Sequence, residues 1–430
     1  MSVTYYFISD LHIGGDEALG VCDYEAELIA FLENLAARSE TAELLIIGDI
    51  FGLWEFTDIA GPEKLKAVME QFPQIFQALQ NTGRTVKITM LPGNHDYEIA
   101  CYPEFVDMLL PYNIHLERTP AITREINGKK IWIEHGNQHD AYNFMPDFGN
   151  PHAQPIGYFI TSSVVSTAGK HSKFGRYNWL KDIQSVYPSE QIPYWVLSNY
   201  FYQEMSPWLR WLIMPFVFLS GFEIFVLAGA ALEWFGKTDI NIFLNNRLFS
   251  SLGFVGNLVQ LILIINTILF VNFVVLAVPL YFIWRDFRSA LQRFRIVINP
   301  AELSSEKEEQ YLEAAQKVFA QDPETVIFIY GHTHFPSLRQ FGPRVVINTG
   351  TWLKRLDDVS TRLRFLPSIY IPFFCLNYFR ISDTDGKITI DYHTIDKAPP
   401  LDLTLLQRLL VFKRPRRSSA PIPERTVLET

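Results

Sequence analysis

The sequence predicts an α/β fold interrupted by a long apolar insertion, and three observations support this prediction. Five short apolar runs, rich in β-branched and aromatic residues, have the length and composition of buried strands. Each run ends in side chains that can hold a metal ion. Between the fourth and the fifth run lies a stretch of 33 residues without an acidic or basic side chain, Leu252–Trp284.

Polar residues follow each predicted strand directly. Each run is followed by its own polar segment: Tyr5–Ser9 by Asp10-Leu11-His12, Glu43–Ile47 by Gly48-Asp49, Val86–Pro92 by Gly93-Asn94-His95-Asp96, Ile131–Glu134 by His135, and Val326–Tyr330 by Gly331-His332-Thr333-His334. Because ligands bind beyond the carboxyl ends of the strands in an open α/β sheet, we expect these segments to converge on one edge. Two Asp, one Asn and four His form an oxygen and nitrogen donor set that suits Mn, Fe or Zn. The pattern predicts a hydrolase with two metal ions.

This order of motifs resembles that of the calcineurin-like metallophosphoesterase superfamily, which is D-x-H, G-D, G-N-H-D/E, a single His and G-H-x-H. The resemblance implies a β-sandwich flanked by helices and two divalent ions, with Mn²⁺ as the first choice and Fe or Zn as alternatives. It also implies in-line attack on phosphorus by a hydroxide that bridges the ions. The implied ligands are Asp10, His12 and His334 for one ion, Asn94, His135 and His332 for the other, and Asp49 as the bridge.

The resemblance further implies two catalytic residues in the third motif. His95 would stand near the leaving oxygen as proton donor, with Asp96 as the partner that orients its imidazole. Asn137 and His139 come directly after the fourth motif and are candidate substrate contacts. Four residues of the insertion are candidate phosphate contacts, with a solvated polar patch as the alternative interpretation: Lys170, His171, Lys173 and Arg176.

The chain length and the positions of the motifs predict the domain organisation. At 430 residues the chain is too long for one compact domain. The metal motifs lie within residues 1–140 and 325–350, so the sequence between them is an insertion. We expect a catalytic domain formed by residues 1–143 and 301–397, an insertion at 144–300, and a tail at 398–430. Residues 144–207 of the insertion are expected to form a lid over the metal motifs or a simple connection.

Charge and cysteine content restrict the partners and the compartment. The net charge is 37 − 46 = −9, and the catalytic part has no broad basic stretch, so we expect no nucleic-acid partner. The three cysteines, Cys22, Cys101 and Cys375, are scattered along the chain, which indicates a reducing compartment. The first predicted strand begins at Tyr5, which leaves no room for a signal peptide. The sequence does not indicate an oligomeric state.

Two apolar stretches within the insertion, at about 211–232 and 255–284, predict a transmembrane helical hairpin. The alternative is two buried core helices, and Glu223 in the first stretch favours this alternative. Because metal motifs flank the insertion on both sides, the chain must cross the membrane an even number of times. Arginines near the exit of the second stretch outnumber the basic residues of the connecting loop, which predicts that the catalytic domain faces the cytoplasm at the cytoplasmic membrane.

The C-terminal third predicts further strands and a tail. Ile369–Ile381 and Lys387–Ile395 have the composition of strands of the second sheet. Leu401–Phe412 predicts an amphipathic helix, which precedes a basic run at 413–417 and suits an anionic membrane surface. A disordered basic tail is the alternative, and the composition of Ser418–Thr430 predicts disorder.

Within the superfamily, Phe7–Gly14 (FISDLHIG) and Gly48–Trp54 (GDIFGLW) resemble the UDP-2,3-diacylglucosamine pyrophosphohydrolase branch, which usually carries Arg where this chain has His95. The resemblance implies cleavage of a lipid-linked sugar diphosphate at the membrane surface, although the insertion of that branch is not usually a transmembrane hairpin. Because the predicted hairpin places lipid head groups near the metal motifs, the first hypothesis is a membrane-anchored phosphoesterase that hydrolyses a phosphoester or pyrophosphate bond of a lipid-linked substrate, with membrane lipids as partners. A membrane-tethered phosphodiesterase or phosphatase for soluble nucleotides or phosphoproteins is the second hypothesis. A non-catalytic membrane scaffold is the third.

Overall fold

The computed structural model of the chain divides into two compact units, residues 1–203 with 300–430 and residues 204–299. The structure describes residues 3–16, 19–171, 180, 182–186, 191–238, 242–243, 247–293, 300–361, 366–399, 403–411 and 421–429. The larger unit contains all five motifs. The first part of the predicted insertion, residues 144–203, belongs to this larger unit as well.

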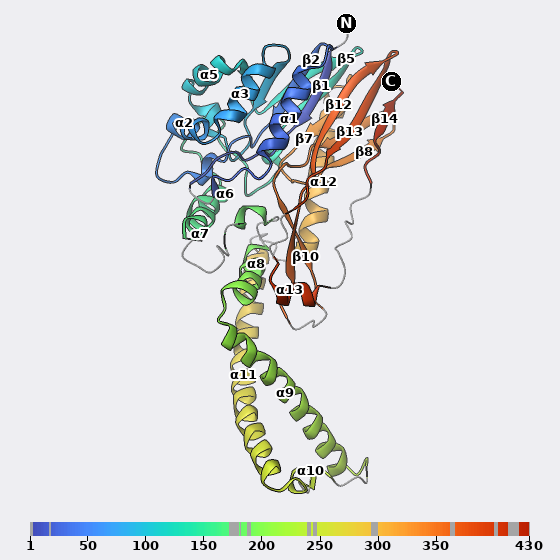
Figure 1. Cartoon of the computed structure of the whole chain (residues 1–430). Coiled ribbons are helices and arrows are strands. Elements are labelled where there is room, and N and C mark those ends of the chain that lie inside the picture. The colour runs from blue at the N-terminus through green and yellow to red at the C-terminus, as the bar shows by residue number, and fades with distance from the viewer. Residues whose placement is uncertain are drawn as a thin grey trace. The chain divides into compact units, whose positions relative to one another are not determined.

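A seven-stranded sheet carries the first three motifs (Figure 1). Its strands are, in spatial order, β14 (Arg425–Leu428), β13 (Lys387–Ile395), β12 (Leu376–Thr384), β1 (Thr4–Ile8), β2 (Ala42–Ile47), β3 (Lys87–Leu91) and β4 (Ile114–Leu116). Strands β1 to β4 are parallel, whereas β12, β13 and β14 add an antiparallel extension to β1. The parallel strands therefore end at one edge, as the sequence predicts for the first three motifs.

A second, five-stranded sheet carries the other two motifs. Its strands are, in spatial order, β5 (Ala121–Ile126), β6 (Lys129–Glu134), β7 (Thr325–Tyr330), β9 (Arg344–Asn348) and β8 (Ser337–Phe341). Strands β6, β7 and β9 are parallel. The expectation of one common sheet edge is thus corrected, because the five motifs come from two sheets. A separate two-stranded sheet consists of β10 (Arg355–Val359) and β11 (Ile369–Phe373).

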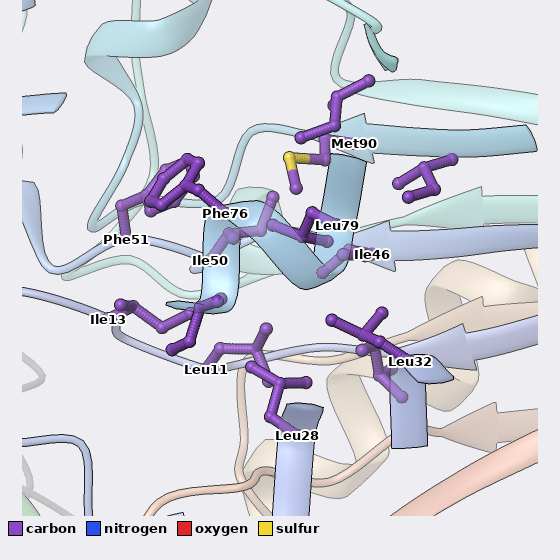
Figure 2. Packing of buried hydrophobic residues seen from close by; sticks show 14 of the residues in the cluster. Leu11, Ile13, Leu28, Leu32, Ile46, Ile50, Phe51, Phe76, Leu79 and Met90 are labelled. Atoms are coloured by element: carbon purple, nitrogen blue, oxygen red, sulfur yellow. The ribbon is translucent and has the colours of Figure 1, made fainter. Parts of the chain in front are cut away.

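The two sheets pack face to face, and helices cover their outer faces. Along β1, Tyr6 and Ile8 pack against the helical side, whereas Tyr5 and Phe7 pack between the sheets, so alternate side chains serve two cores. On the helical side, Leu28 and Phe76 pack against the sheet (Figure 2). The helices on this side are α1 (Glu25–Ala36), α2 (Pro62–Gln71), α3 (Pro73–Thr82), α4 (Glu98–Cys101) and α5 (Glu104–Leu109).

A long helix covers the outer face of the five-stranded sheet. Helix α12 (Pro300–Gln321) buries Tyr311, Ala315 and Phe319 against Phe328 and Tyr330 of β7. The larger unit is therefore a β-sandwich flanked by helices, which is the architecture that the sequence predicts.

Residues 144–203 form short helices that pack on the larger unit. They are α6 (Ile156–Ile160), a π-helical turn (Thr161–Val165), α7 (Ser166–His171), α8 (Ile192–Asn199) and a second π-helical turn (Tyr200–Glu204). Val165 and Trp195 pack in one apolar cluster with Leu19 and Tyr370 of the sandwich. Lys354 joins this region by ion pairs of 2.7 Å to both Asp23 and Asp182.

The smaller unit contains two long helices and a short one. Helices α9 (Pro207–Trp234) and α11 (Gly253–Arg293) lie side by side and are joined through α10 (Arg247–Ser250) (Figure 1). Their bounds confirm the positions of the two predicted helices. Within the described residues, one stretch is long and apolar enough to cross a membrane, Gly253–Ile283, with a mean hydropathy of 2.8. One such helix is weak evidence for a membrane protein, and the prediction of two spans stays a prediction.

Two predictions for the C-terminal part are wrong. The stretch Ile369–Ile381 is not one strand but is shared between β11 and β12, which belong to different sheets. The end of the tail is not disordered, because Arg425–Leu428 forms edge strand β14 and buries Leu428 completely. The tail helix is confirmed in a shorter form, α13 (Leu405–Leu410), with a capping box between Thr404 and Gln407. The basic residues 413–417 lie outside the described residues.

Candidate metal centre

The seven predicted ligands lie in the turns that follow strands β1, β2, β3, β6 and β7. Five of them have a positive φ: Asp10 (52°), His12 (46°), Asp49 (50°), His332 (66°) and His334 (59°). This conformation is uncommon outside glycine and costs about 1–3 kcal/mol for each residue, so it persists only where the surroundings impose it. Backbone hydrogen bonds between neighbouring turns do so here, from Asp10 N–H to Gly48 O (3.1 Å) and from His12 N–H to Asp49 O (2.8 Å).

Asp10, His12 and His334 form a first cluster. His334 Nε2 lies 3.2 Å from Asp10 Oδ1 and 3.3 Å from His12 Nε2. The ligand atoms of the three residues all lie within 4.8 Å of one another. The structure thus brings together residues from the first and the fifth motif, which are more than 300 positions apart in the sequence.

Asp49, His135 and His332 form a second cluster with the same spacing. His135 Nε2 lies 3.2 Å from Asp49 Oδ2 and 3.2 Å from Asn94 Oδ1. The same oxygen of Asp49 lies 3.7 Å from His12 Nε2 in the first cluster. Asp49 therefore stands between the clusters, where the sequence predicts a bridging ligand.

Two glycines leave room for this arrangement. A Cβ atom at Gly93 would lie 2.2 Å from Asp49 Oδ1, and one at Gly48 would lie 2.3 Å from His135 Nδ1. Neither position tolerates a side chain while the ligands keep their places. The backbone N–H of His95, two residues after Gly93, then donates to Asp49 Oδ1 at 2.7 Å.

The donor groups fit divalent cations. His332 Nδ1 is buried and makes no hydrogen bond within the described residues, and buried Asp10 Oδ1 faces His334 Nε2, itself a proposed ligand, at 3.2 Å. Such groups are costly unless they bind a cation or water. Burial and the neighbouring His95 hold the pKa of His12 well below its usual range, which keeps the imidazole neutral as a metal ligand must be. Burial alone would lower the pKa of His135, but Asp49 and Asp10 raise it to about 10, so this pocket favours positive charge.

His95 lies beside the first cluster and is held by Glu55, not by Asp96. Its Nδ1 is 2.9 Å from Glu55 Oε1, and the Trp54 ring packs on the imidazole at 4.5 Å between centroids, with the ring planes tilted by 35°. Glu55, His95 and His12 form a third group whose ligand atoms lie within 4.8 Å. Burial alone would lower the pKa of His95, but Glu55 and Asp49 raise it to about 9.

The predicted role of Asp96 as the orienting partner of His95 is therefore wrong. Asp96 is fully buried and accepts hydrogen bonds from the backbone N–H groups of Gly93 (2.6 Å), Ile50 (2.7 Å) and Phe51 (3.3 Å). Its carboxylate is occupied by these donors, which ties the turn after β3 to the turn after β2. Asp96 thus shapes the site through the backbone.

Asp140 is a site residue that sequence reasoning missed. Its Oδ2 lies 3.1 Å from His332 Nε2, which leaves the unpaired Nδ1 of that ring as the metal-binding atom. Carboxylates that hold a ligating imidazole in this way fix its tautomer and orientation. The available signal was its position, five residues after His135 in the same turn.

The predicted substrate contacts have partners within the protein. Asn137 Nδ2 donates to Asn143 O at 3.0 Å, and His139 Nε2 lies 2.6 Å from Glu134 Oε1. Their role in substrate binding stays a prediction. Of the candidate phosphate contacts, Lys173 and Arg176 lie outside the described residues, and for Lys170 and His171 only the backbone of α7 is described.

Comparisons with known proteins agree with this arrangement of motifs. The sequence profile of the calcineurin-like phosphoesterase family matches residues 3–201. The chain is also similar to the DNA polymerase II small subunit of Pyrococcus horikoshii, with 28% identity over 170 residues, which cover 34% of this chain and 25% of that protein. The chain thus matches about a quarter of the length of this curated relative.

Solved structures give only distant similarity. Vps29 of Entamoeba histolytica, crystallised with zinc, has a TM-score of 0.27 at 9% identity and covers 91% of this chain and 92% of its own. A conserved protein of Streptococcus pneumoniae, described as a predicted phosphoesterase, has a TM-score of 0.27 at 10% identity, with 91% and 88% covered. The phosphopantetheinyl hydrolase of Mycobacterium tuberculosis has a TM-score of 0.25 at 11% identity, with 86% and 96% covered. These scores are too low to carry an argument about function.

Proposed function

We propose, from the match of residues 3–201 to the calcineurin-like phosphoesterase family, that this chain is a membrane-anchored phosphoesterase with two metal ions. The proposed reaction is hydrolysis of a phosphoester or pyrophosphate bond in a lipid-linked substrate. Family membership gives the reaction class, metal-dependent phosphoester hydrolysis. The observation that carries the proposal of two ions is the pair of ligand clusters that share Asp49.

The proposed ligands divide as the motifs suggest. Asp10, His12 and His334 would hold one ion, and Asn94, His135 and His332 the other. Asp49 would contribute to both, because one of its oxygens faces His12 and His135. When bound, divalent ions lower the pKa of water and stabilise charge on phosphate oxygens, and Mn²⁺ is our first choice, with Fe or Zn as alternatives.

His95 is the proposed proton donor to the leaving oxygen. Glu55 holds its Nδ1 and Trp54 packs on its ring, so the orientation of the imidazole is fixed before substrate binds. A proton donor in a fixed position contributes about 10²–10⁴-fold to the rate. Asp49 accepts the backbone N–H of His95, which couples the position of the proton donor to that of the bridging ligand.

The experiment for the metal centre compares wild type with Asp49→Ala. We expect about two equivalents of Mn²⁺ in the wild type, and loss of at least one equivalent and of nearly all turnover in the variant. An active wild-type protein that retains at most one metal ion would contradict the dinuclear proposal. Loss of turnover with full metal content in the variant would contradict the bridging role of Asp49.

The lipid-linked substrate and the membrane anchor rest on the smaller unit. Gly253–Ile283 has the length and hydropathy of a membrane span, and only 11% of its most apolar window is buried. We propose two spans, α9 and α11, because both flanks of the insertion carry metal ligands. The excess of arginines after the second apolar stretch over the basic residues of the connecting loop supports a cytoplasmic side for the larger unit. Turnover of detergent-solubilised lipid pyrophosphates with Mn²⁺ tests the substrate class. Equal or better turnover of a small water-soluble diester would contradict the lipid proposal.

Two alternatives make different predictions. A tethered enzyme for soluble nucleotides or phosphoproteins would prefer those compounds to lipid pyrophosphates in the same assay. A non-catalytic scaffold would keep its cellular role after Asp49→Asn, although metal binding is lost. The similarity to a polymerase subunit covers about a quarter of that protein, and the net charge of −9 disfavours a nucleic-acid partner for this chain.

A further inference from the structure

The segment next to the metal centre has an apolar surface on its outer side. In α6 and the π-helical turn behind it, four side chains at helical spacing are exposed: Ile156 (58%), Phe159 (58%), Ile160 (39%) and Val164 (51%). In α8 and the π-helical turn behind it, three more are exposed at a spacing of three residues: Tyr194 (49%), Leu197 (57%) and Tyr200 (40%). We call these seven residues the outer apolar face. Apolar patches of this kind on a soluble surface usually mark an interaction site.

The other side of the same helices is fixed to the catalytic unit. Val165 and Trp195 are buried in one apolar cluster with Tyr370. Ser198 Oγ donates to Ser368 O at 2.6 Å, and Tyr202 O–H donates to Pro367 O at 2.8 Å. The helices therefore cannot turn their outer apolar face inward without breaking this packing.

The inner side of α6 also borders the metal centre. The Tyr158 ring meets the Trp54 ring edge to face at 5.8 Å between centroids, and Trp54 in turn packs against the His95 ring. Met145 packs against Trp54 in the same cluster. Tyr158 on the inner side of α6 thus contacts Trp54, which contacts the proposed proton donor His95. The exposed residues of α6 face away from the protein.

The chemistry of the outer apolar face favours lipid over protein as its partner. Residues 156–168 and 191–203 contain no Asp, Glu, Lys or Arg. Charged and polar groups usually secure specificity across a protein interface, whereas a lipid interface favours apolar side chains with Tyr at the boundary to water. Three hydroxyl side chains, Thr161, Ser162 and Ser163, come directly after Phe159 and Ile160 in the sequence.

The chain connection supplies the second argument. Helix α8 and its π-helical turn end at Glu204, and α9 of the proposed membrane unit begins at Pro207. Trp208 is 82% exposed at the start of α9, where an aromatic anchor at the membrane surface is expected. If α9 and α11 span a bilayer, only a few residues of chain separate α8 from the surface of that bilayer.

We propose that the outer apolar face lies in the interfacial layer of a phospholipid bilayer, so that the metal centre receives phosphate groups presented at that surface. This inference rests on the proposed membrane anchor and specifies how the same site meets its substrate. The bilayer is the one occupant proposed. A second copy of the chain on the same face is the competing outcome that the experiment separates.

The test uses the full chain in nanodiscs of phosphatidylcholine and phosphatidylglycerol, loaded with Mn²⁺. A photoreactive benzoylphenylalanine replaces Phe159 or Leu197 in the outer apolar face. Leu110, which is 65% exposed after α5, serves as the negative control, and Leu269 of α11, which is 55% exposed, as the positive control for the span. We expect lipid adducts at positions 159, 197 and 269 and none at 110.

The other outcomes are distinguishable. Lipid adducts at 269 but not at 159 and 197 would overturn this inference while the membrane anchor stands. Crosslinks from 159 to a second copy of the chain would overturn it too, in favour of a dimer interface. Absence of lipid adducts at all four positions would overturn the membrane anchor and this inference together, without touching the reaction class.

A kinetic measurement adds a readout that does not depend on crosslinking. The double variant Phe159→Ser, Ile160→Ser should lower kcat/KM for a bilayer-embedded lipid pyrophosphate about tenfold, as expected when one or two apolar side chains lose their buried site. Turnover of bis-p-nitrophenyl phosphate should stay within about twofold, and Leu110→Ser should change neither value, as is usual for exposed positions. Equal losses on both substrates in the double variant would contradict the inference.

Discussion

Glu55 and Asp140 each hold one ring nitrogen of a histidine in the metal centre. Glu55 takes Nδ1 of His95, and Asp140 takes Nε2 of His332. For His332 this leaves Nδ1 as the metal-binding atom, and for His95 it leaves Nε2 as the atom that would donate the proton. The two carboxylates therefore act on orientation and charge, and their effects can be separated from those of the proposed ligands by measuring metal content and turnover independently.

Glu55→Gln should lower kcat with little change in metal content. The variant keeps the size of the side chain but removes the charge that holds His95, so we expect a loss of about 10–100-fold, smaller than the ~10²–10⁴-fold loss in His95→Ala. Because Glu55 is proposed to act through His95, the double variant should be no slower than His95→Ala alone. Additive losses, or loss of a metal ion from Glu55→Gln, would show that the carboxylate is a ligand with His12 and His95.

Asp96→Asn provides a contrast within the same turn. Asp96 binds backbone N–H groups of two turns and does not touch the imidazole of His95 within the described residues. Its loss should lower the melting temperature and the metal content, and it should add to the effect of His95→Ala. If Asp96→Asn instead left stability unchanged and coupled fully to His95→Ala, the original assignment of Asp96 as the partner of His95 would be restored.

Asp140→Ala should weaken metal binding without abolishing it. Partners of ligating histidines usually contribute 10–100-fold to metal affinity or activity, so we expect about a 10–100-fold increase in the Kd for Mn²⁺ and recovery of turnover at high Mn²⁺. Asp147→Asn is the control, because Asp147 is an exposed acid of the same segment that binds Asn150. Unchanged Mn²⁺ affinity in Asp140→Ala would mean that His332 does not bind metal through Nδ1.

At the scale of single residues, the sequence revealed the ligands better than their partners. The ligands follow strand ends in motif spacing, which is visible in a one-dimensional pattern. The partners depend on how two turns fold together. Glu55 reaches His95 from a short 3-10 turn at Leu53–Glu55. Asp140 lies after β6 and reaches His332, which lies after β7 of the same sheet. No spacing rule connects these pairs.

At the scale of elements, strand positions were predictable and strand partners were not. All five apolar runs became strands with bounds close to those predicted. The stretch from Ile369 to Ile381 has continuous strand composition, but the chain changes sheets at Phe374 and Cys375. Strand β14 has only four residues after a polar segment, and its stability comes from pairing with β13 and from burial of Leu428. Such tertiary contributions leave no local signal.

Glu43 of β2 ties the two sheets together and gives a testable pH dependence. Arg124 of β5 donates to it twice, at 2.9 and 3.0 Å, and Thr89 of β3 donates at 2.6 Å. Burial alone would raise the pKa of Glu43, but these bonds and the Arg124 charge lower it below 4.5. A depressed pKa in the folded state adds stability that is present above the unfolded-state pKa and is lost as the pH falls through the folded-state value.

Glu43→Gln should therefore lower the free energy of unfolding by about 2 kcal/mol at pH 7, since the half-buried Arg124 loses the nearer of its two carboxylate partners. The difference from wild type should shrink as the pH falls below about 4.5, where wild-type Glu43 itself becomes protonated. Urea unfolding of metal-free protein at pH 7 and at several values below 4.5 measures this. Glu324→Gln, at a mostly exposed position, is the control. A constant difference at all pH values would contradict the assignment of the effect to charge.

At the scale of the whole molecule, the catalytic sandwich is assembled from two parts of the chain that flank the smaller unit. His332 and His334 come after residues 204–299, and the other five ligands come before them. Within the described residues, the smaller unit contributes none of the proposed ligands. The order of motifs in the sequence was enough to predict an insertion. The sequence did not indicate that residues 144–203 belong to the larger unit, because their packing on Leu19 and Tyr370 joins distant positions.

The two units should be separable in function. We expect a protein in which a Gly/Ser linker of about 20 residues replaces residues 204–299 to fold, because such a linker spans roughly 25 Å on average and loop length has a small effect on stability. It should bind Mn²⁺ as the full chain does and hydrolyse bis-p-nitrophenyl phosphate at a rate within about twofold, as expected for a change that removes none of the proposed ligands. Turnover of lipid pyrophosphate in vesicles should fall at least about tenfold, because the substrate and the enzyme no longer share a surface. Equal turnover of the vesicle substrate by both proteins would show that the hairpin does not deliver the metal centre to lipid, and the tethered-enzyme hypothesis would then be the better account.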